Sequence, residues 1–335
     1  MPKIVIDSST TRHEAEGFRF PLGVYPVEPI KPISGYIVEF ESADGDNEAD
    51  WEEWPDRFVF DIQVTSQRLR PLCKLLFSFL PGRVYPILDV LGNDAYREVD
   101  PYIAFELVGI ERFFDGVLHF DDWLFEDGLV GFGAMSMNPF FYIFVDEHKA
   151  ITIRAGHELK ERVERALAAF DLGVVKDLAG VDSVAHEHRT VLAAPEAGDQ
   201  GALAPEEITD WLVENWLLQL NVDPRTNVDD LGRDLGNTAW RMVARCVAEE
   251  GGPSVYAEIL LVAGCIENAE LLAIEASKTP QDAPFQVPAA GWYEVHMPVC
   301  DRVTPERLKD MLGQTDDIPL IDERVLRVFW YREDA

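Results

Sequence analysis

The chain has 335 residues, of which 47% are hydrophobic and 11% are aromatic, so it can form a packed core and is not a disordered protein. Its 61 acidic side chains outnumber its 29 basic ones, and the net charge of −32 argues against a surface for nucleic acid. The chain lacks an apolar run of about 18 residues that could span a membrane, and residues 1–16 lack the apolar segment of a secretion signal. We therefore expect a soluble, cytoplasmic protein of about two domains.

The four cysteines are far apart in the chain, and none belongs to a Cys-x-x-Cys pair. Such spacing is not typical of a zinc site or a redox motif. We expect buried free thiols in a reducing compartment, without cofactor or metal; they are Cys73, Cys246, Cys265 and Cys300.

Residues 3–40 alternate short apolar runs with prolines, and residues 36–40 are a strand candidate. The following segment, residues 39–56, holds nine carboxylates and no basic residue. Its core resembles a calcium loop, but Ala49 stands where the loop needs glycine and Pro55 where it needs glutamate, so we do not expect calcium.

The same acidic segment is our candidate for partner binding. Tryptophans among carboxylates are unusual in a purely solvated loop, and tryptophan is enriched in interface hot spots. A solvated loop and tryptophans that fold back onto the protein remain open as alternatives. The candidate residues are Asp44, Asp46, Glu48, Asp50, Trp51, Glu52, Glu53 and Trp54.

Residues 58–64 have the pattern of a strand, and Leu69, Cys73, Phe77 and Leu80 recur at helical spacing. Further strands are predicted at residues 84–90 and 102–110. After them, Asp115-Gly116 is typical of a hairpin turn. The strand expected after this turn would place His119 and Asp121 on one face, a pair that suits acid–base or metal chemistry but lacks a third partner. Residues 128–139, rich in glycine, are expected to form a packed loop.

Residues 140–175 give the clearest local prediction. The apolar residues 141–145 and 150–154 are expected to form two strands, joined by the polar turn at residues 146–149. Leu159, Val163, Leu167 and Phe170 then repeat at helical spacing, and Gly173 is expected to end the helix.

Residues 181–204 are polar and rich in small side chains, which indicates a linker between domains at 1–180 and 205–335. Two histidines in this linker, His186 and His188, could chelate a metal weakly, but solvated histidines are the more ordinary interpretation. Pro205 is expected to open a helix.

The second domain is predicted to be helix-rich. Residues 237–250 are expected to form a helix, whereas residues 256–277 fit either one helix or a strand followed by a helix. A strand at 291–299, a helix from Thr304 to Gly313 and a strand at 325–331 complete the chain. The expected fold class is α+β, with a mixed or antiparallel sheet flanked by helices in the first domain and a smaller α+β second domain.

Residues 37–177 resemble a family of bacterial immunity proteins, the eleventh catalogued for polymorphic toxin systems and formerly a domain of unknown function. The resemblance lies in an extended stretch that enters a serine-capped helix, a proline-containing strand, an apolar strand flanked by acids, and a strand and helix that close on Leu-Gly. These segments are residues 64–72, 84–89, 105–111 and 151–173.

The resemblance implies a cytoplasmic protein that binds and neutralises a cognate toxin, without catalytic residues of its own. A strongly acidic inhibitor suits a basic toxin domain. Two alternatives remain open. One is an acidic scaffold that binds through residues 205–335, with Trp211, Trp216 and Trp240 partly exposed. The other is a hydrolase that uses His119 with Asp121 or Asp122.

Overall fold

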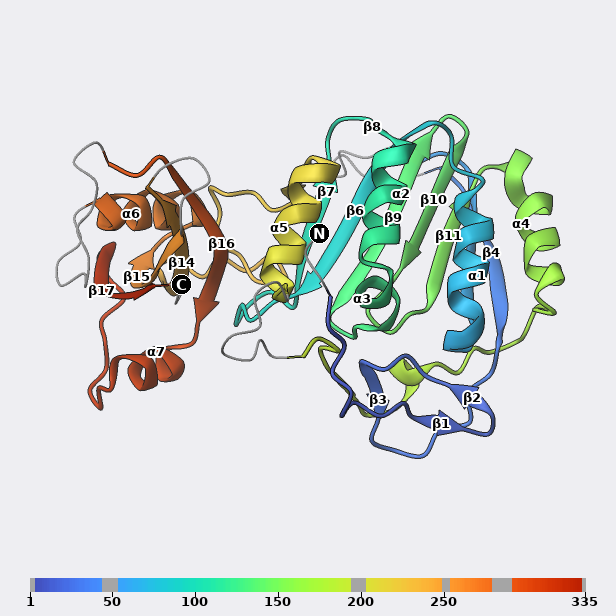
Figure 1. The fold of residues 1–335 in the computed structure, drawn as a ribbon, viewed down its shortest axis with the longest axis horizontal. Coiled ribbons are helices and arrows are strands. Elements are labelled where there is room, and N and C mark those ends of the chain that lie inside the picture. Colours follow the sequence, from blue (N-terminus) through green and yellow to red (C-terminus); the bar gives the residue numbers. More distant parts are fainter. Residues whose placement is uncertain (1–3, 44–53, 194–202, 249–253, 279–290, 333–335) are drawn as a thin grey trace. The chain divides into compact units, whose positions relative to one another are not determined.

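The computed structural model describes residues 4–43, 54–193, 203–248, 254–278 and 291–332. The chain forms two compact units (Figure 1). Unit 1 comprises residues 1–91 and 100–221, and unit 2 comprises residues 92–99 and 222–335. This division differs from the predicted one, because the described part of the expected linker and the first helix after it belong to unit 1. None of the described helices is long and apolar enough to cross a membrane.

A nine-stranded sheet is the centre of unit 1. Its order is β13-β7-β6-β9-β10-β11-β5-β4, and β8 pairs separately with β6. Neighbouring strands from β6 to β4 are antiparallel. The strands are β4 (Gly35–Glu41), β5 (Arg57–Gln63), β6 (Arg83–Leu91), β7 (Val99–Ala104), β8 (Val108–Gly109), β9 (Val130–Met137), β10 (Phe140–Val145), β11 (Ile151–Ala155) and β13 (Leu218–Leu220).

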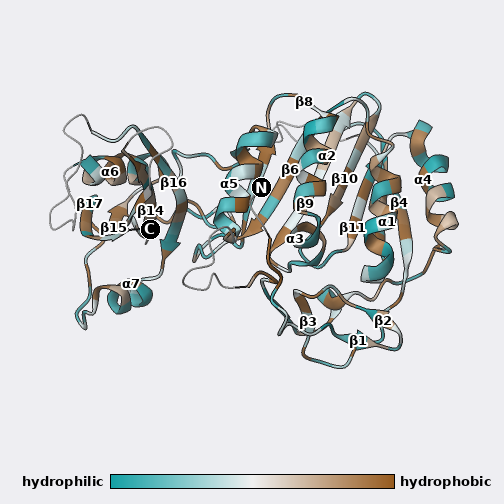
Figure 2. Cartoon of the chain, viewed as in Figure 1, coloured by the Kyte–Doolittle hydropathy of each residue, from teal (hydrophilic) through white to brown (hydrophobic). Residues whose placement is uncertain are grey.

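Helices cover one face of this sheet, and their apolar sides turn toward it (Figure 2). Alternate strand residues such as Phe60, Ile143 and Ile153 join the buried helix residues in a single core. The helices are α1 (Ser66–Phe77), α2 (Ile110–His119), α3 (Asp121–Glu126), α4 (His157–Ala169) and α5 (Pro205–Trp216). The predicted α+β class is therefore confirmed.

Four short strands and a 3-10 turn form a separate layer at one end of the sheet (Figure 1). They are β1 (Glu14–Ala15), β2 (Phe18–Arg19), β3 (Val24–Pro26), η1 (Val181–Ser183) and β12 (His186–His188). β1 pairs with β2, and β3 pairs with β12.

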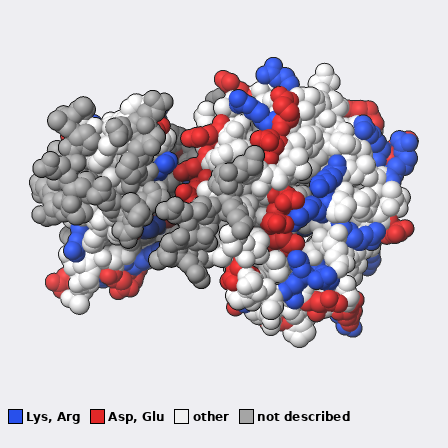
Figure 3. All heavy atoms as spheres, viewed as in Figure 1, with Lys and Arg blue, Asp and Glu red and all other residues white. Residues whose placement is uncertain are grey.

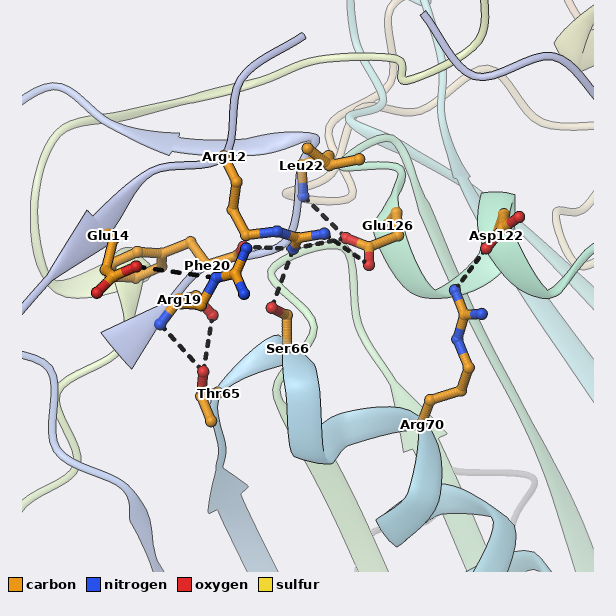
Figure 4. A network of polar contacts seen from close by, with 10 residues as sticks. All are labelled: Arg12, Glu14, Arg19, Phe20, Leu22, Thr65, Ser66, Arg70, Asp122 and Glu126. Atoms are coloured by element: carbon orange, nitrogen blue, oxygen red, sulfur yellow. Dashed lines mark hydrogen bonds and ion pairs between the residues drawn. The ribbon is translucent and has the colours of Figure 1, made fainter. Parts of the chain in front are cut away.

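Arg12 connects this layer to helices α1 and α3 through hydrogen bonds (Figure 4). Its guanidinium donates two hydrogen bonds of 2.9 Å to the carboxylate of Glu126 and one of 2.9 Å to the hydroxyl of Ser66. The same carboxylate accepts a hydrogen bond from the backbone N–H of Leu22. A bidentate, half-buried pair of this kind fixes geometry as well as adding energy.

Unit 2 contains a four-stranded antiparallel sheet in the order β16-β14-β15-β17. Its elements are β14 (Thr238–Val247), β15 (Ser254–Ala263), α6 (Ile266–Lys278), β16 (Glu294–Val303), α7 (Pro305–Leu312) and β17 (Arg324–Arg332). The predicted α7 is confirmed: Thr304 caps it, and Gly313 ends it with a φ of 64°. The expected richness in helix is not observed, since the described part of unit 2 has four long strands and two helices.

Three predicted elements are wrong. The helix expected at residues 237–250 is not observed: residues 238–247 form the strand β14, because Trp240, Met242, Ala244 and Cys246 alternate into the core with a period of two. The expected loop at residues 128–139 is β9. Asp115-Gly116 lies inside α2 rather than in a hairpin turn.

The packing of α2 against α5 explains why residue 116 is a glycine. A Cβ on Gly116 would lie 2.6 Å from Nε1 of Trp216, so the glycine gives α5 room to approach α2. Trp216 uses that room to donate a 3.1 Å hydrogen bond to the carbonyl of Arg112. Gly116 therefore allows the two helices to pack closely and does not form a turn.

Three of the four thiols are buried as expected, and Cys300 is half-buried.

Candidate functional site

Most of the predicted partner-binding segment lies outside the described residues, namely Asp44, Asp46, Glu48, Asp50, Trp51, Glu52 and Glu53. Trp54 is described, and it folds back onto the sheet. Its ring meets Phe140 and Tyr142 edge-on, with centroids 5.6 and 5.9 Å away. The guanidinium of Arg154 lies 4.9 Å from the same ring, within range of a cation–π contact.

Trp54 lies on the face of the sheet opposite the core. The strand registers define one continuous row across this face, in which each residue is paired with the next. The row alternates with core residues along every strand, and no helix in the described part of unit 1 covers it (Figure 1). Its members are Tyr85, Met135, Tyr142, Arg154, Val59 and Glu39. We call these six residues and Trp54 the cross-strand row.

Charged side chains lie within this row and beside it. Glu39 and Asp61 are exposed carboxylates on the same face. Burial, together with the nearby charge of Glu147, raises the pKa of Asp89 to about 6. Burial also raises the pKa of Tyr142 to about 12, against the opposing charge of Arg154. The helix-covered face, by contrast, carries acidic and basic side chains intermixed (Figure 3).

His119 and its neighbouring carboxylates do not occur on a strand, which corrects the prediction. His119 ends α2 and stacks on Trp211 with 8° between the ring planes. Asp121 and Asp122 begin α3, and both bind the guanidinium of Arg70, at 3.0 and 2.8 Å. The imidazole and the carboxylates therefore have different partners.

The tryptophans proposed for a scaffold surface are mostly internal. Trp216 and Trp240 are 0% and 1% exposed, so the expectation of partial exposure is wrong for both. Trp211 alone is half-buried.

Three histidines meet at one end of unit 1. His148 belongs to the turn between β10 and β11, whereas His186 and His188 are on one side of β12. The Nε2 atom of His186 lies 3.1 Å from Nε2 of His148 and 3.1 Å from Nε2 of His188. The ligand atoms of all three residues lie within 4.8 Å of one another, so they could hold a metal ion.

Each of the three rings has a second partner at Nδ1. Nδ1 of His186 is 2.7 Å from the carbonyl of Val184, and Nδ1 of His188 is 2.7 Å from the carbonyl of Gly128. Nδ1 of His148 is 3.3 Å from the carboxylate of Glu147. Burial opposes charge on His148, but the hydrogen bond and charge of Asp146 and the charge of Glu147 outweigh it and raise its pKa.

A buried lysine supports the turn that carries His148. Lys149 is 1% exposed and has a φ of 66°, and its ammonium donates to the carbonyl of Val130. Burial lowers the pKa of Lys149 to about 8.

The sequence indicates His186 and His188 as a possible metal-chelating pair but does not identify a third ligand. The His-x-His pattern on a strand was the available signal, since it places both rings on one side. His148 carries no such signal, because it precedes His186 by 38 residues and lies in a polar turn.

Comparisons with protein-family models, with curated proteins and with solved structures find no match to this chain.

Proposed function

We propose that the chain is an immunity-type binding protein that neutralises a cognate bacterial toxin by covering its surface. The observation that carries the proposal is the cross-strand row, where Trp54, Tyr142 and Arg154 are in mutual contact on the helix-free face. The resemblance of residues 37–177 to an immunity family and the net charge of −32 support the same conclusion.

The composition of the row suits the centre of a protein interface. Tryptophan, tyrosine and arginine are the residues most enriched in hot spots. The three side chains hold one another in place, so less conformational entropy is lost when a partner binds. Glu39 on β4 and Asp61 on β5 then form an acidic rim at one side of an aromatic centre.

The acidic excess indicates a basic partner. A protein with a net charge of −32 attracts a cationic domain and accelerates the encounter, and salt weakens this effect. The rim would therefore control the association rate, while the aromatic centre would control the dissociation rate.

The test is co-expression with the toxin-type protein encoded beside this gene, followed by co-purification and binding kinetics. We expect a one-to-one complex whose association rate falls as salt rises. If no complex forms even at low salt, the proposal should be abandoned.

Variants locate the interface. We expect Trp54→Ala to raise Kd by about 30-fold or more, mainly through faster dissociation, because a hot-spot truncation costs about 2 kcal/mol. Phe105→Ala is the matched control, since Phe105 is an aromatic residue of unit 1 that is 57% exposed and is not a member of the row. Equal affinities of the two variants would contradict the assignment of the row.

Glu39→Gln with Asp61→Asn tests the rim. We expect slower association and a weaker dependence on salt, with dissociation unchanged. Glu106→Gln, at an exposed position beside Phe105, is the control.

A further inference from the structure

The hydrogen bonds of the three-histidine cluster fix which nitrogen of each ring bears its proton. The carbonyls of Val184 and Gly128 only accept hydrogen bonds, so Nδ1 of His186 and of His188 must be N–H donors. A neutral imidazole has one N–H, which leaves a lone pair on each Nε2. The carboxylate of Glu147 beside Nδ1 favours the same tautomer in His148.

When all three rings are neutral, each therefore brings a lone pair into the shared cluster. Nε2 of His186 is 3.1 Å from both of its neighbours, at a distance where acceptors repel unless a cation lies between them. A single proton on one Nε2 can satisfy only one such pair at a time. A metal ion accepts all three lone pairs at once.

We propose that His148, His186 and His188 form a mononuclear site for a divalent first-row transition ion, with Zn²⁺ as the best-suited occupant. This inference does not depend on the proposed toxin binding. Imidazole nitrogens favour zinc, copper and nickel, whereas calcium and magnesium take oxygen ligands.

The separation of the nitrogens fits such an ion. A Zn–N bond of about 2.0–2.1 Å in a tetrahedral site places two ligand nitrogens about 3.3 Å apart. The two observed Nε2 separations of 3.1 Å are close to this value. Three protein ligands leave a fourth position for water or for an external ligand.

The surroundings of the cluster complete the site. Ligand histidines ordinarily donate their other N–H to a carboxylate or a backbone carbonyl, and here both kinds of acceptor are present. Asp146 and Glu147, next to His148, would offset the charge of the ion.

The bound ion would join two parts of unit 1. β12 pairs with β3 in the end layer, whereas the turn at His148 belongs to the nine-stranded sheet. Because the ion binds the folded arrangement and not the unfolded chain, its removal should loosen the end layer.

The first experiment is a zinc titration of the full chain, produced without a polyhistidine tag and stripped with a chelator. We expect one equivalent of zinc to bind and to raise the melting temperature. His148→Ala and His186→Ala should each weaken binding by more than about 100-fold, which exceeds the usual effect of losing an outer partner. Glu147→Gln should weaken it by about 10- to 100-fold.

Two variants separate ligation from folding. His296→Gln, which removes an exposed imidazole in unit 2, should bind zinc as the unmodified chain does. His148→Cys supplies a different zinc ligand at the same position and should recover much of the affinity lost in His148→Ala.

Cobalt substitution gives a direct spectroscopic readout. The visible spectrum of the Co²⁺-loaded chain should be that of a low-coordinate, nitrogen-ligated site and should vanish in His186→Ala. Binding that survives in the histidine variants would overturn the proposal. Failure to bind zinc, cobalt, nickel or copper would overturn it as well and would assign a shared proton to the cluster.

Discussion

His186 and His188 are two residues apart on β12, and their Nε2 atoms lie 3.1 Å from each other. Nδ1 of each ring donates a hydrogen bond to a different backbone carbonyl, so neither ring is free to turn this N–H toward the other ring. Alternation along the strand places both rings on one side, and pairing with β3 holds the strand in position. The turn between β10 and β11 then supplies His148 to the same point.

Asp89 predicts a dependence of stability on pH. Its pKa is about 6 in the folded chain against 3.8 ordinarily, because the folded chain disfavours the charged form. Relative to the charged form, protonated Asp89 stabilises the folded chain; this stabilisation is fully present below pH 3.8 and is lost as pH rises through 6. Asp89→Asn should therefore increase the free energy of unfolding by about 2–3 kcal/mol at pH 8 and change it little at pH 4.

Chemical denaturation at both pH values, with a chelator present, measures this difference. Asp61→Asn, at an exposed carboxylate on the same face, is the control and should have little effect at either pH. An equal effect of Asp89→Asn at pH 4 and pH 8 would show that burial of the charge is not the cause.

The ion pair between Asp94 and Arg302 predicts a large stability effect in unit 2. The two side chains are 0% and 3% exposed, and Nη2 of Arg302 lies 2.9 Å from Oδ1 of Asp94. Asp94→Ala leaves a buried guanidinium without its counter-ion, so we expect unit 2 to lose about 3–5 kcal/mol.

Limited proteolysis together with denaturant unfolding can follow unit 2 in the full chain. The control is Glu275→Ala, which removes an exposed partner of Lys278 and should cost less than about 1 kcal/mol. Comparable losses in the two variants would contradict the importance of burial.

Gly116 tests the packing of α2 against α5. Gly116→Ala favours the helix by about 1 kcal/mol but places a Cβ 2.6 Å from Nε1 of Trp216, and overpacking of this kind costs about 1–3 kcal/mol. We expect a net loss of stability and a shift in the tryptophan fluorescence of the folded chain.

Gly82→Ala is the matched glycine variant, because a Cβ there meets nothing within 4 Å. Its stability should stay close to that of the unmodified chain. A stable Gly116→Ala variant with unchanged fluorescence would mean that α5 does not pack closely on α2.

The sequence predicts elements well where local signals agree. α7 has a capping threonine, a first-turn proline and a terminal glycine, and β10, β11 and α4 have clear periodicity. Prediction fails where a local signal has a long-range cause. Gly116 resembles a turn residue, but a glycine is needed there because Trp216, about a hundred positions later, packs against it. In β14, Trp240, Val243 and Val247 also fit a helix, and the sheet partners decide the outcome.

The candidate sites follow the same rule. His186 and His188 are visible as a strand pattern, but their convergence with His148 depends on strand pairing that no local pattern specifies. The sequence makes Trp54 a candidate for partner binding and leaves open that it folds back onto the protein. Its contacts with Tyr142 and Arg154 show that it folds back onto the sheet.

X-ray absorption at the zinc edge of the loaded full chain tests the metal site most directly. We predict a first shell containing three nitrogens at about 2.0–2.1 Å, with the outer-shell scattering of imidazole rings. In His186→Ala this signal should lose one imidazole or disappear. A shell of oxygen or sulfur alone, or an unchanged spectrum in His186→Ala, would contradict the assignment.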